Sequence, residues 1–415
     1  MKRASDLCPL ILCLLISAAL PTSLHAQQVP GATALPDHPY SIKKTWIIGG
    51  VGNWDYLTLD PVALKLFIAH GPVVQVVDVE TGAVIGQVAG LRQAHDIALD
   101  ETGEFGYVSD GPAGQVKIFD RRSLQVVASI PTGPSPRAVV FDPQNRLLFA
   151  ICTTAAAGAF PQNKNQQPNR DSEIKTSVTV IDTQTRQPLG EILMPGQLGF
   201  AQTDGNGQVF ISIVNRNQIA HLDAGAIATF LRNPTASSSS DPRRQPATPQ
   251  ILDWSRESQM PSSAQNRMNI FTLGPDCPQS SGLAVDHDHQ RLFAACNNMK
   301  MVVLNASSGQ FVASLPTGPG TDAIAYDPNH SLIYTANGGA QGSLTVIRQD
   351  VTDTYAVIQD LPTRQRARTL AVNPATGEVY LVTDLLGVNL AKPGGIGSLQ
   401  PAPVNGSFQV LVIGN

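Results

Sequence analysis

Residues 95–135 read HDIALDETGEFGYVSDGPAGQVKIFDRRSLQVVASIPTGPS, and most of the chain repeats this pattern. The stretch contains four short runs rich in Val, Ile, Phe or Tyr, separated by turn residues such as Glu-Thr-Gly and Gly-Pro-Ala-Gly. Such runs are typical of β-strands. A unit of about 40 residues with four strands has the period of a β-propeller blade, so the repeat predicts an all-β propeller.

Seven copies of the repeat align on an Asp or Asn that ends the first strand and on an aromatic residue in the second strand. The aligned pairs are Asp60/Phe67, Asp100/Tyr107, Asp142/Phe149, Asp204/Phe210, Asp286/Phe293, Asp327/Tyr334 and Asn373/Tyr380. A closed ring of repeats is one domain whose size follows from the number of blades. The sequence therefore predicts a single seven-bladed propeller of four-stranded antiparallel blades over residues 43–415. Its blades are expected to start near residues 54, 95, 136, 198, 281, 321 and 367.

Many of the polar residues in the repeat are explained by turns. Asp-Pro pairs begin at residues 60, 142 and 327, where the Asp side chain can cap its own loop while Pro presets φ. A second set precedes short polar hairpin turns between the third and fourth strands: Asp78, Asp120 and Asn305. We assign these side chains to the fold before any function.

The two ends of the chain are expected to meet in blade 7. Residues 43–50, KKTWIIGG, have the pattern of an outer strand without a blade of their own, and the last unit ends after residues 407–413 without an outer strand. The N-terminal strand is therefore predicted to complete blade 7, which removes exposed sheet edges. Two insertions, residues 153–176 and 224–266, are predicted on opposite faces of the ring, and residues 226–232 have the pattern of a short helix.

Residues 1–26 have the order of a secretory signal peptide: Lys2 and Arg3, an apolar run over residues 7–20, and a small-residue site ending at Ala26. Residues 27–42 are then a linker. The apolar run is short for a membrane span, so the mature chain is expected to be periplasmic or secreted, without stable membrane insertion. Only 14% of residues are charged and the net charge is −4, which argues against a nucleic-acid partner.

Repeated motifs give the chain a family resemblance. Tyr107-Val-Ser-Asp110, Tyr334-Thr-Ala-Asn337 and Tyr380-Leu-Val-Thr383 recur, with Pro-Thr-Gly-Pro links at residues 131–134 and 316–319. From about Tyr40 onward the chain resembles the YVTN-type, WD40-like β-propeller repeat proteins. The resemblance implies an exported bacterial propeller and is not specific for an activity. No Cys-x-x-Cys-His motif for covalent haem occurs in the sequence, and no cofactor is predicted.

The alignment also places one residue per blade at the start of the innermost strand, five positions before the repeat Asp. These residues are expected to surround the mouth of the central channel: Asp55, His95, Arg137, Ser281, Asp322 and Arg368, with Leu198 or Gly199 in blade 4. The charges can simply neutralise one another in a wet channel mouth. Alternatively, Arg137 and Arg368 can bind a small anion, because guanidinium groups bind carboxylates and phosphates in bidentate fashion.

A third interpretation of the ring is a divalent metal site formed by Asp55, His70, His95 and Asp110. The second strand returns to the channel-mouth face ten positions after the repeat Asp, which is where His70 and Asp110 lie. Carboxylate and imidazole ligands suit zinc or another divalent ion, but this spacing follows no metal-binding motif.

The favoured function is non-catalytic: an exported propeller that binds a small ligand or a protein partner at the channel-mouth face. The alternative is a propeller enzyme with its site in the channel, either a lactonase-like hydrolase or a metal- or cofactor-dependent oxidoreductase. A lactonase needs oxygen ligands that converge on calcium, and the ring has few acids. A Ser281 nucleophile needs a nearby base, yet His95 is expected across the channel.

Three cysteines remain after the leader and its Cys8 and Cys13 are removed. Cys277 lies in the link that enters blade 5, and Cys296 ends the second strand of the same blade, so both are expected on the channel-mouth face. Cys152 occupies the equivalent position in blade 3, with blade 4 between. A disulfide between Cys277 and Cys296 is therefore predicted.

Overall fold

The computed structural model describes residues 38–50, 52–153, 175–232, 250–254, 268–351, 353–388 and 401–415. The predicted leader over residues 1–26, most of the predicted linker, and the larger parts of both predicted insertions lie outside the described residues.

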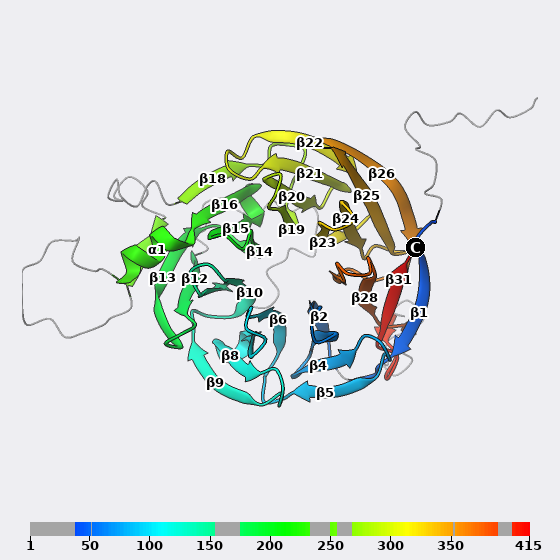
Figure 1. Cartoon of the computed structure of the whole chain (residues 1–415), viewed down its shortest axis with the longest axis horizontal. Coiled ribbons are helices and arrows are strands. Elements are labelled where there is room, and N and C mark those ends of the chain that lie inside the picture. Colours follow the sequence, from blue (N-terminus) through cyan, green and yellow to red (C-terminus); the bar gives the residue numbers. More distant parts are fainter. Residues whose placement is uncertain are drawn as a thin grey trace, which may run out of the picture. The chain divides into compact units, whose positions relative to one another are not determined.

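Seven antiparallel sheets form a propeller ring, which confirms the predicted fold class (Figure 1). Blade 1 contains β2 (Trp54–Asp60), β3 (Lys65–His70), β4 (Val73–Asp78) and β5 (Val84–Val88). Blade 2 contains β6 (Ala94–Leu99), β7 (Phe105–Asp110), β8 (Gln115–Asp120) and β9 (Val126–Pro131). Blade 3 contains β10 (Pro136–Asp142), β11 (Leu147–Cys152), β12 (Lys175–Asp182) and β13 (Gln187–Pro195). Blade 4 contains β14 (Leu198–Thr203), β15 (Gln208–Ile213), β16 (Gln218–Asp223) and β18 (Met268–Thr272).

The remaining three blades follow the same plan. Blade 5 contains β19 (Ser280–Asp286), β20 (Arg291–Cys296), β21 (Lys300–Asn305) and β22 (Phe311–Pro316). Blade 6 contains β23 (Thr321–Asp327), β24 (Leu332–Asn337), β25 (Ser343–Val351) and β26 (Thr354–Pro362). Blade 7 contains β27 (Leu370–Val372), β28 (Val379–Thr383), β31 (Gln409–Gly414) and β1 (Ser41–Ile47). Its innermost strand begins three residues later than the start predicted at residue 367.

The position of each strand in its blade follows from its apolar pattern. Second strands such as β11, LLFAIC, and β20, RLFAAC, are buried at every position because neighbouring blades cover both faces. An outer strand such as β5 is buried only at Val88 and faces solvent elsewhere. Continuous apolar runs therefore form the middle of each blade, and mixed runs form its rim.

Strand β1 completes blade 7, which confirms the predicted closure of the ring. It pairs antiparallel with β31, and Figure 1 shows the two side by side in blue and red. Trp46 on β1 stacks on Tyr380 of blade 7, with ring centroids 5.9 Å apart. The hydroxyl groups of Tyr40 and Tyr334 lie 2.8 Å apart, which links the residue before β1 to blade 6. The N-terminal segment therefore joins two blades as well as both chain ends.

The second predicted insertion adds structure to the neighbouring blade. Helix α1 (Ala224–Arg232) follows β16 directly and packs Ile227 and Leu231 into the core between blades 3 and 4. Strand β17 (Gln250–Asp253) then forms a fifth strand of blade 3, parallel to β13. The sequence indicated the helix but not the added strand, because four residues between polar segments show no periodicity. Within the described ranges, no helix is long and apolar enough to cross a membrane.

A third interruption of the repeat was not predicted. Strands β29 (Leu386–Val388) and β30 (Pro401–Pro403) form a two-stranded ribbon between the second and third strands of blade 7.

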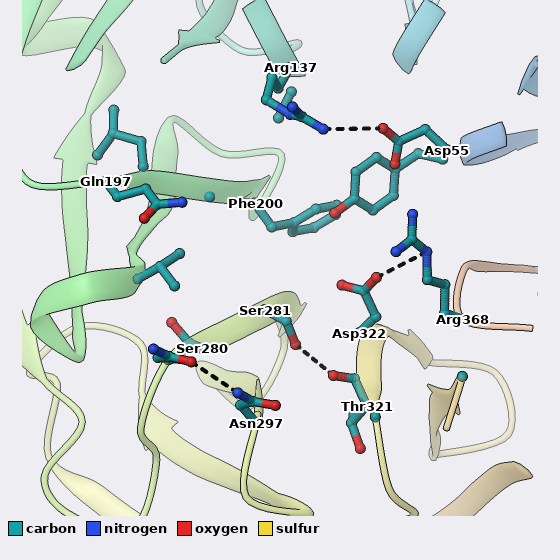
Figure 2. A pocket seen from close by; sticks show the side chains of 18 of the residues that line it. Asp55, Arg137, Gln197, Phe200, Ser280, Ser281, Asn297, Thr321, Asp322 and Arg368 are labelled. Atoms are coloured by element: carbon teal, nitrogen blue, oxygen red, sulfur yellow. Dashed lines mark hydrogen bonds and ion pairs between the residues drawn. The ribbon is translucent and has the colours of Figure 1, made fainter. Parts of the chain in front are cut away.

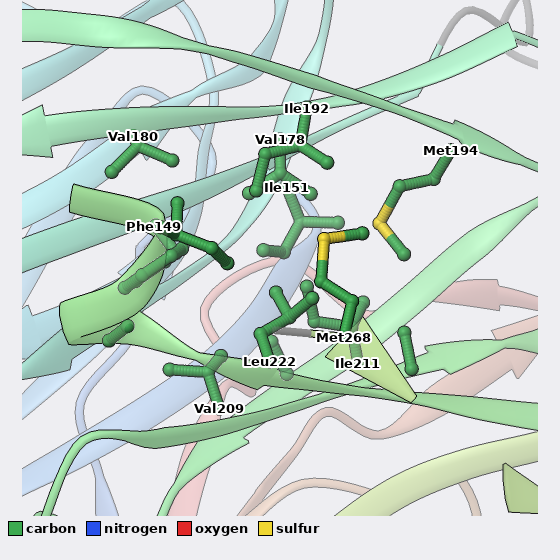
Figure 3. Packing of buried hydrophobic residues seen from close by; sticks show 14 of the residues in the cluster. Phe149, Ile151, Val178, Val180, Ile192, Met194, Val209, Ile211, Leu222 and Met268 are labelled. Atoms are coloured by element: carbon green, nitrogen blue, oxygen red, sulfur yellow. The ribbon is translucent and has the colours of Figure 1, made fainter. Parts of the chain in front are cut away.

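Apolar clusters fill the spaces between neighbouring blades. The cluster between blades 3 and 4 is drawn in Figure 3, where Phe149 and Ile151 of β11 face Val209 and Ile211 of β15. Met268, on the outer strand β18, extends the same cluster outward. Because each cluster takes residues from two neighbouring blades, the blades stabilise one another and the ring forms a single structural unit.

Candidate functional site

A cavity of about 670 Å³ opens where the innermost strands begin, at the mouth of the central channel. This volume falls in the range of roughly 300–1,000 Å³ that small-molecule sites occupy. Five of the six predicted ring residues line it (Figure 2): Asp55, Arg137, Ser281, Asp322 and Arg368. The sixth, His95, lies behind the wall, 4% exposed, with its Nδ1 2.9 Å from Asp55 Oδ2.

Two loose ion pairs form the charged side of this cavity. Arg137 Nη2 lies 3.9 Å from Asp55 Oδ2, and Arg368 Nε lies 3.5 Å from Asp322 Oδ2. The two arginine side chains are 45% and 48% exposed. Within the described part of the chain, neither guanidinium group donates a hydrogen bond to a protein acceptor. Each arginine therefore keeps N–H donors for a ligand.

Blade 4 gives the cavity an apolar side. Leu198, Phe200 and Val214 line it, and Figure 2 shows the Phe200 ring reaching toward the middle of the site. Phe200 meets Tyr56 of blade 1 across the channel, with ring centroids 5.1 Å apart. Both aromatic residues lie four positions before their repeat Asp. The expected ring residues lie five positions before this Asp or ten after it, so these two aromatic residues were not predicted, although the same alignment contains them.

Burial changes the ionisation of the cavity wall. Burial raises the pKa of Asp322, and the nearby Arg368 only partly opposes this effect. Burial, followed by the charges of Asp322 and Asp55, raises the pKa of Tyr56 well above its ordinary value. Next to His95, burial raises the pKa of Asp96 to about 7. Asp322 and Asp96 are therefore protonated at a higher pH than ordinary carboxyl groups.

The predicted metal ligands do not come together. His70 Nδ1 lies 2.7 Å from Gln75 Oε1, and Asp110 accepts hydrogen bonds from the backbone amides of residues 92 and 93. Of the four predicted ligands, only Asp55 and His95 contact each other. Across the ranges that the structure describes, no group of three His, Cys, Asp or Glu side chains could hold a metal ion. The structure therefore does not support this ligand set, because His70 and Asp110 order the links between strands.

Ser281 takes part in a contact between blades. Its hydroxyl group donates a hydrogen bond to the Thr321 carbonyl of blade 6 at 3.1 Å. The same kind of contact joins blade 7 to blade 1, where the Thr369 hydroxyl donates to the Asp55 carbonyl at 3.0 Å. A structural role thus accounts for Ser281, and His95 contacts Asp55 instead of this hydroxyl group.

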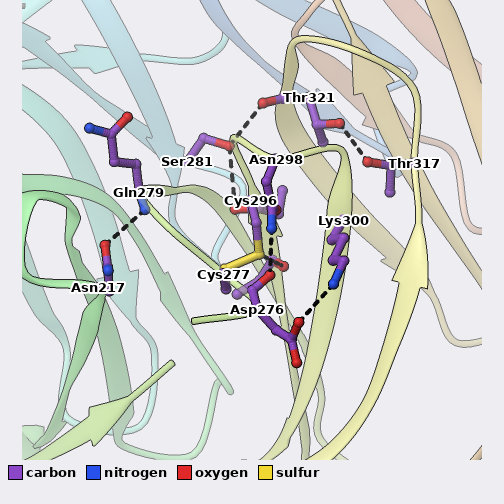
Figure 4. Close-up of a disulfide and its surroundings, with 12 residues drawn as sticks. Asn217, Asp276, Cys277, Gln279, Ser281, Cys296, Asn298, Lys300, Thr317 and Thr321 are labelled. Atoms are coloured by element: carbon purple, nitrogen blue, oxygen red, sulfur yellow. Dashed lines mark hydrogen bonds and ion pairs between the residues drawn. A yellow bond between two sulfur atoms is a disulfide. The ribbon is translucent and has the colours of Figure 1, made fainter. Parts of the chain in front are cut away.

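A disulfide braces the part of the wall that blade 5 contributes. Cys277 and Cys296 are bonded with their Cα atoms 5.0 Å apart (Figure 4). Gln279 and Asn297, two residues and one residue further along, line the cavity and share a side-chain hydrogen bond of 2.9 Å. Cys152 is free and buried, and burial raises the pKa of its thiol to about 11.

Comparison with known proteins identifies the fold and no narrower class. No family model matches the chain, and no curated protein matches it by sequence. A chain in the crystal structure of the mitotic checkpoint complex is 14% identical and superposes with a TM-score of 0.60, covering 88% of this chain and 96% of that chain. U3-55K is 10% identical, with a TM-score of 0.58 and coverage of 89% and 97%. Both are WD40-type β-propellers, and at these identities the likeness shows the fold alone.

Proposed function

We propose that the protein is an exported, non-catalytic β-propeller that binds a small anionic ligand, or an anionic group of a protein partner, in the channel-mouth cavity. The observation that carries this proposal is the pair Arg137 and Arg368, which stand half exposed in one cavity with loose carboxylate partners. A guanidinium group with unused donors can bind a carboxylate or phosphate through two parallel hydrogen bonds.

A second cavity, of about 220 Å³, makes a useful comparison. It opens between blades 4 and 5, near the ends of the innermost strands, and Asp204, Asp286 and His287 line it. Neither Lys nor Arg is among its described lining residues. An anion is therefore expected at the channel mouth and not in this cavity.

Export is supported by the signal-peptide pattern of residues 1–26 and by the bond between Cys277 and Cys296, since disulfides persist in oxidising compartments. The alternative function, a hydrolase or oxidoreductase at the same mouth, gains no support from Ser281 or from the separated His and Asp side chains.

The test is the double variant Arg137→Ala/Arg368→Ala, with Arg122→Ala/Arg348→Ala as a control that removes the same charge from exposed positions. Binding of propanoate, citrate and phosphate is measured by calorimetry and by thermal shift. The mouth variant should bind anions at least 10-fold more weakly, about 1.4 kcal/mol, with little change in melting temperature. The control should behave like wild type.

One result would place the site elsewhere. If anion binding survives the double change at the mouth but disappears when residues 233–266 are deleted, the ligand binds at the second insertion and the proposal fails.

A further inference from the structure

The channel-mouth cavity has two chemically different sides. Arg137 and Arg368 lie on the charged side, whereas Leu198, Phe200 and Val214 of blade 4 form the apolar side. We infer that the ligand is an amphipathic carboxylate, with an anionic head and a flat or branched apolar body; this inference rests on the proposed function.

The head of such a ligand would lie against the arginines. Gly338 of blade 6 lets Arg368 pack closely against it, because a Cβ atom at that position would lie 2.7 Å from the Arg368 Cβ. The carboxyl groups of Asp55 and Asp322 hold the guanidinium groups at 3.9 and 3.5 Å without saturating their donors. A carboxylate can therefore bind without breaking a protein hydrogen bond.

The body of the ligand would lie against blade 4. An inorganic anion would contact the arginines and leave the rest of a cavity of about 670 Å³ to water. Phe200 is half-buried and already packs against Tyr56, so its ring offers an ordered surface for a planar group. Burying apolar surface there adds affinity that an anion alone does not gain.

Three probes separate the two parts of the ligand: propanoate, 3-phenylpropanoate and 3-phenylpropan-1-ol. Their dissociation constants are measured by NMR titration and calorimetry on the mature wild-type chain. We expect 3-phenylpropanoate to bind at least 10-fold more tightly than propanoate, about 1.4 kcal/mol, and the alcohol to bind more weakly than 3-phenylpropanoate.

Phe200→Ala should remove most of the gain from the phenyl group, so that 3-phenylpropanoate binds this variant little more tightly than propanoate does. Val214→Thr keeps the side-chain volume while adding a hydroxyl group, so it should reduce the same gain less strongly and serves if Phe200→Ala does not fold. Phe311→Ala is the matched control, because this ring is 55% exposed on outer strand β22. It should leave all three dissociation constants unchanged.

Each contrary result has one meaning. Equal affinities for the two carboxylates, both lost in Arg137→Ala/Arg368→Ala, would overturn the amphipathic ligand and leave the anion site standing. An alcohol that binds as tightly as 3-phenylpropanoate would overturn this inference. The absence of binding by the carboxylates, citrate and phosphate alike would overturn the proposed function and this inference with it.

Discussion

Arg121 joins blade 1 to blade 2 through a buried ion pair, and replacing it by Met should strongly destabilise the ring. Asp60 is 3% exposed, and its Oδ1 accepts hydrogen bonds from the backbone amides of Val62 and Ala63, as predicted for a turn cap. Its Oδ2 pairs with an Arg121 guanidinium nitrogen. Arg121 also donates a hydrogen bond to the Asp100 carbonyl at 2.9 Å. The change Arg121→Met leaves the Asp60 carboxylate buried without a cationic partner.

The expected loss of stability follows from this burial. Removing one partner of a buried ion pair costs about 3–5 kcal/mol, because the other charge stays desolvated. The pair Lys300–Asp276 is the matched control, since its side chains are 40% and 51% exposed and its N–O distance is 2.7 Å. An exposed pair contributes about 0–1 kcal/mol, so Lys300→Met should change little.

Urea unfolding followed by circular dichroism measures both variants. Arg121→Met should lower the midpoint far more than Lys300→Met, with similar m-values for both. A loss below about 1 kcal/mol for Arg121→Met, equal to that of the control, would refute the claim that this contact holds blades 1 and 2 together.

The same ion pair predicts how the stability difference between wild type and Arg121→Met depends on pH. Burial raises the pKa of Asp60. The hydrogen bonds from the Ala63 amide and the Arg121 guanidinium group together lower this pKa by more, so the net shift is downward. A carboxyl group with a lowered folded-state pKa contributes stability that is complete above about pH 4 and is lost as pH falls through the folded pKa. The gap between wild type and Arg121→Met should therefore be full at pH 7 and shrink in acid. A gap that widens below pH 4 would contradict this explanation.

Three further predictions concern ring closure and the cysteines. Deleting residues 27–50 removes β1 and exposes the edge of β31, so the truncated chain should melt well below the chain that retains them; equal melting temperatures would contradict closure by this strand. The disulfide joins residues 19 positions apart and should contribute about 3 kcal/mol, and peptide mapping without reduction that recovers Cys277 and Cys296 as free thiols would disprove it. Because burial raises the pKa of Cys152 to about 11, a thiol reagent at pH 8 should find no reactive group in a folded chain of residues 27–415 and one after unfolding without reductant; a reactive thiol in the folded chain would be inconsistent with its burial.

The sequence predicted the parts of the fold that repeat. An Asp at a strand end followed by a buried aromatic recurs in the blades, so errors in one blade are corrected by the others. Closure by residues 43–50 could also be predicted, because a missing outer strand at one end matched an extra strand at the other. Strand β17 and the ribbon of β29 and β30 occur once each, and periodicity gives no signal for an element that does not repeat.

No local sequence pattern indicated that the repeat Asp also contacts another blade. Turn chemistry accounts for one carboxylate oxygen and gives no indication of what the other contacts. In the structure, Asp142 Oδ1 accepts from the Gly207 amide of blade 4, and Asp286 Oδ2 accepts from the Gln349 side chain of blade 6. These partners lie 65 and 63 positions away, beyond the reach of local patterns.

The candidate site was predictable in part for a related reason. The alignment grouped residues by their position on the innermost strand, and five of the six ring residues line one cavity. It could not show which side chains point into the cavity, and it therefore treated His95 and Arg137 alike. Only His95 is buried, behind the Asp55 carboxylate that both of them contact.

Arg121 differs from the two mouth arginines in how far the fold accounts for its guanidinium group. Arg121 is 7% exposed and contacts Asp60 and Asp100, so the fold alone explains why a guanidinium group is present. Arg137 and Arg368 are about half exposed and face carboxylates at 3.9 and 3.5 Å, too far for strong hydrogen bonds. Exposed pairs of this kind contribute little to stability, so the ring would fold without them. Their place opposite an apolar wall is what leads us to propose a ligand that contacts both.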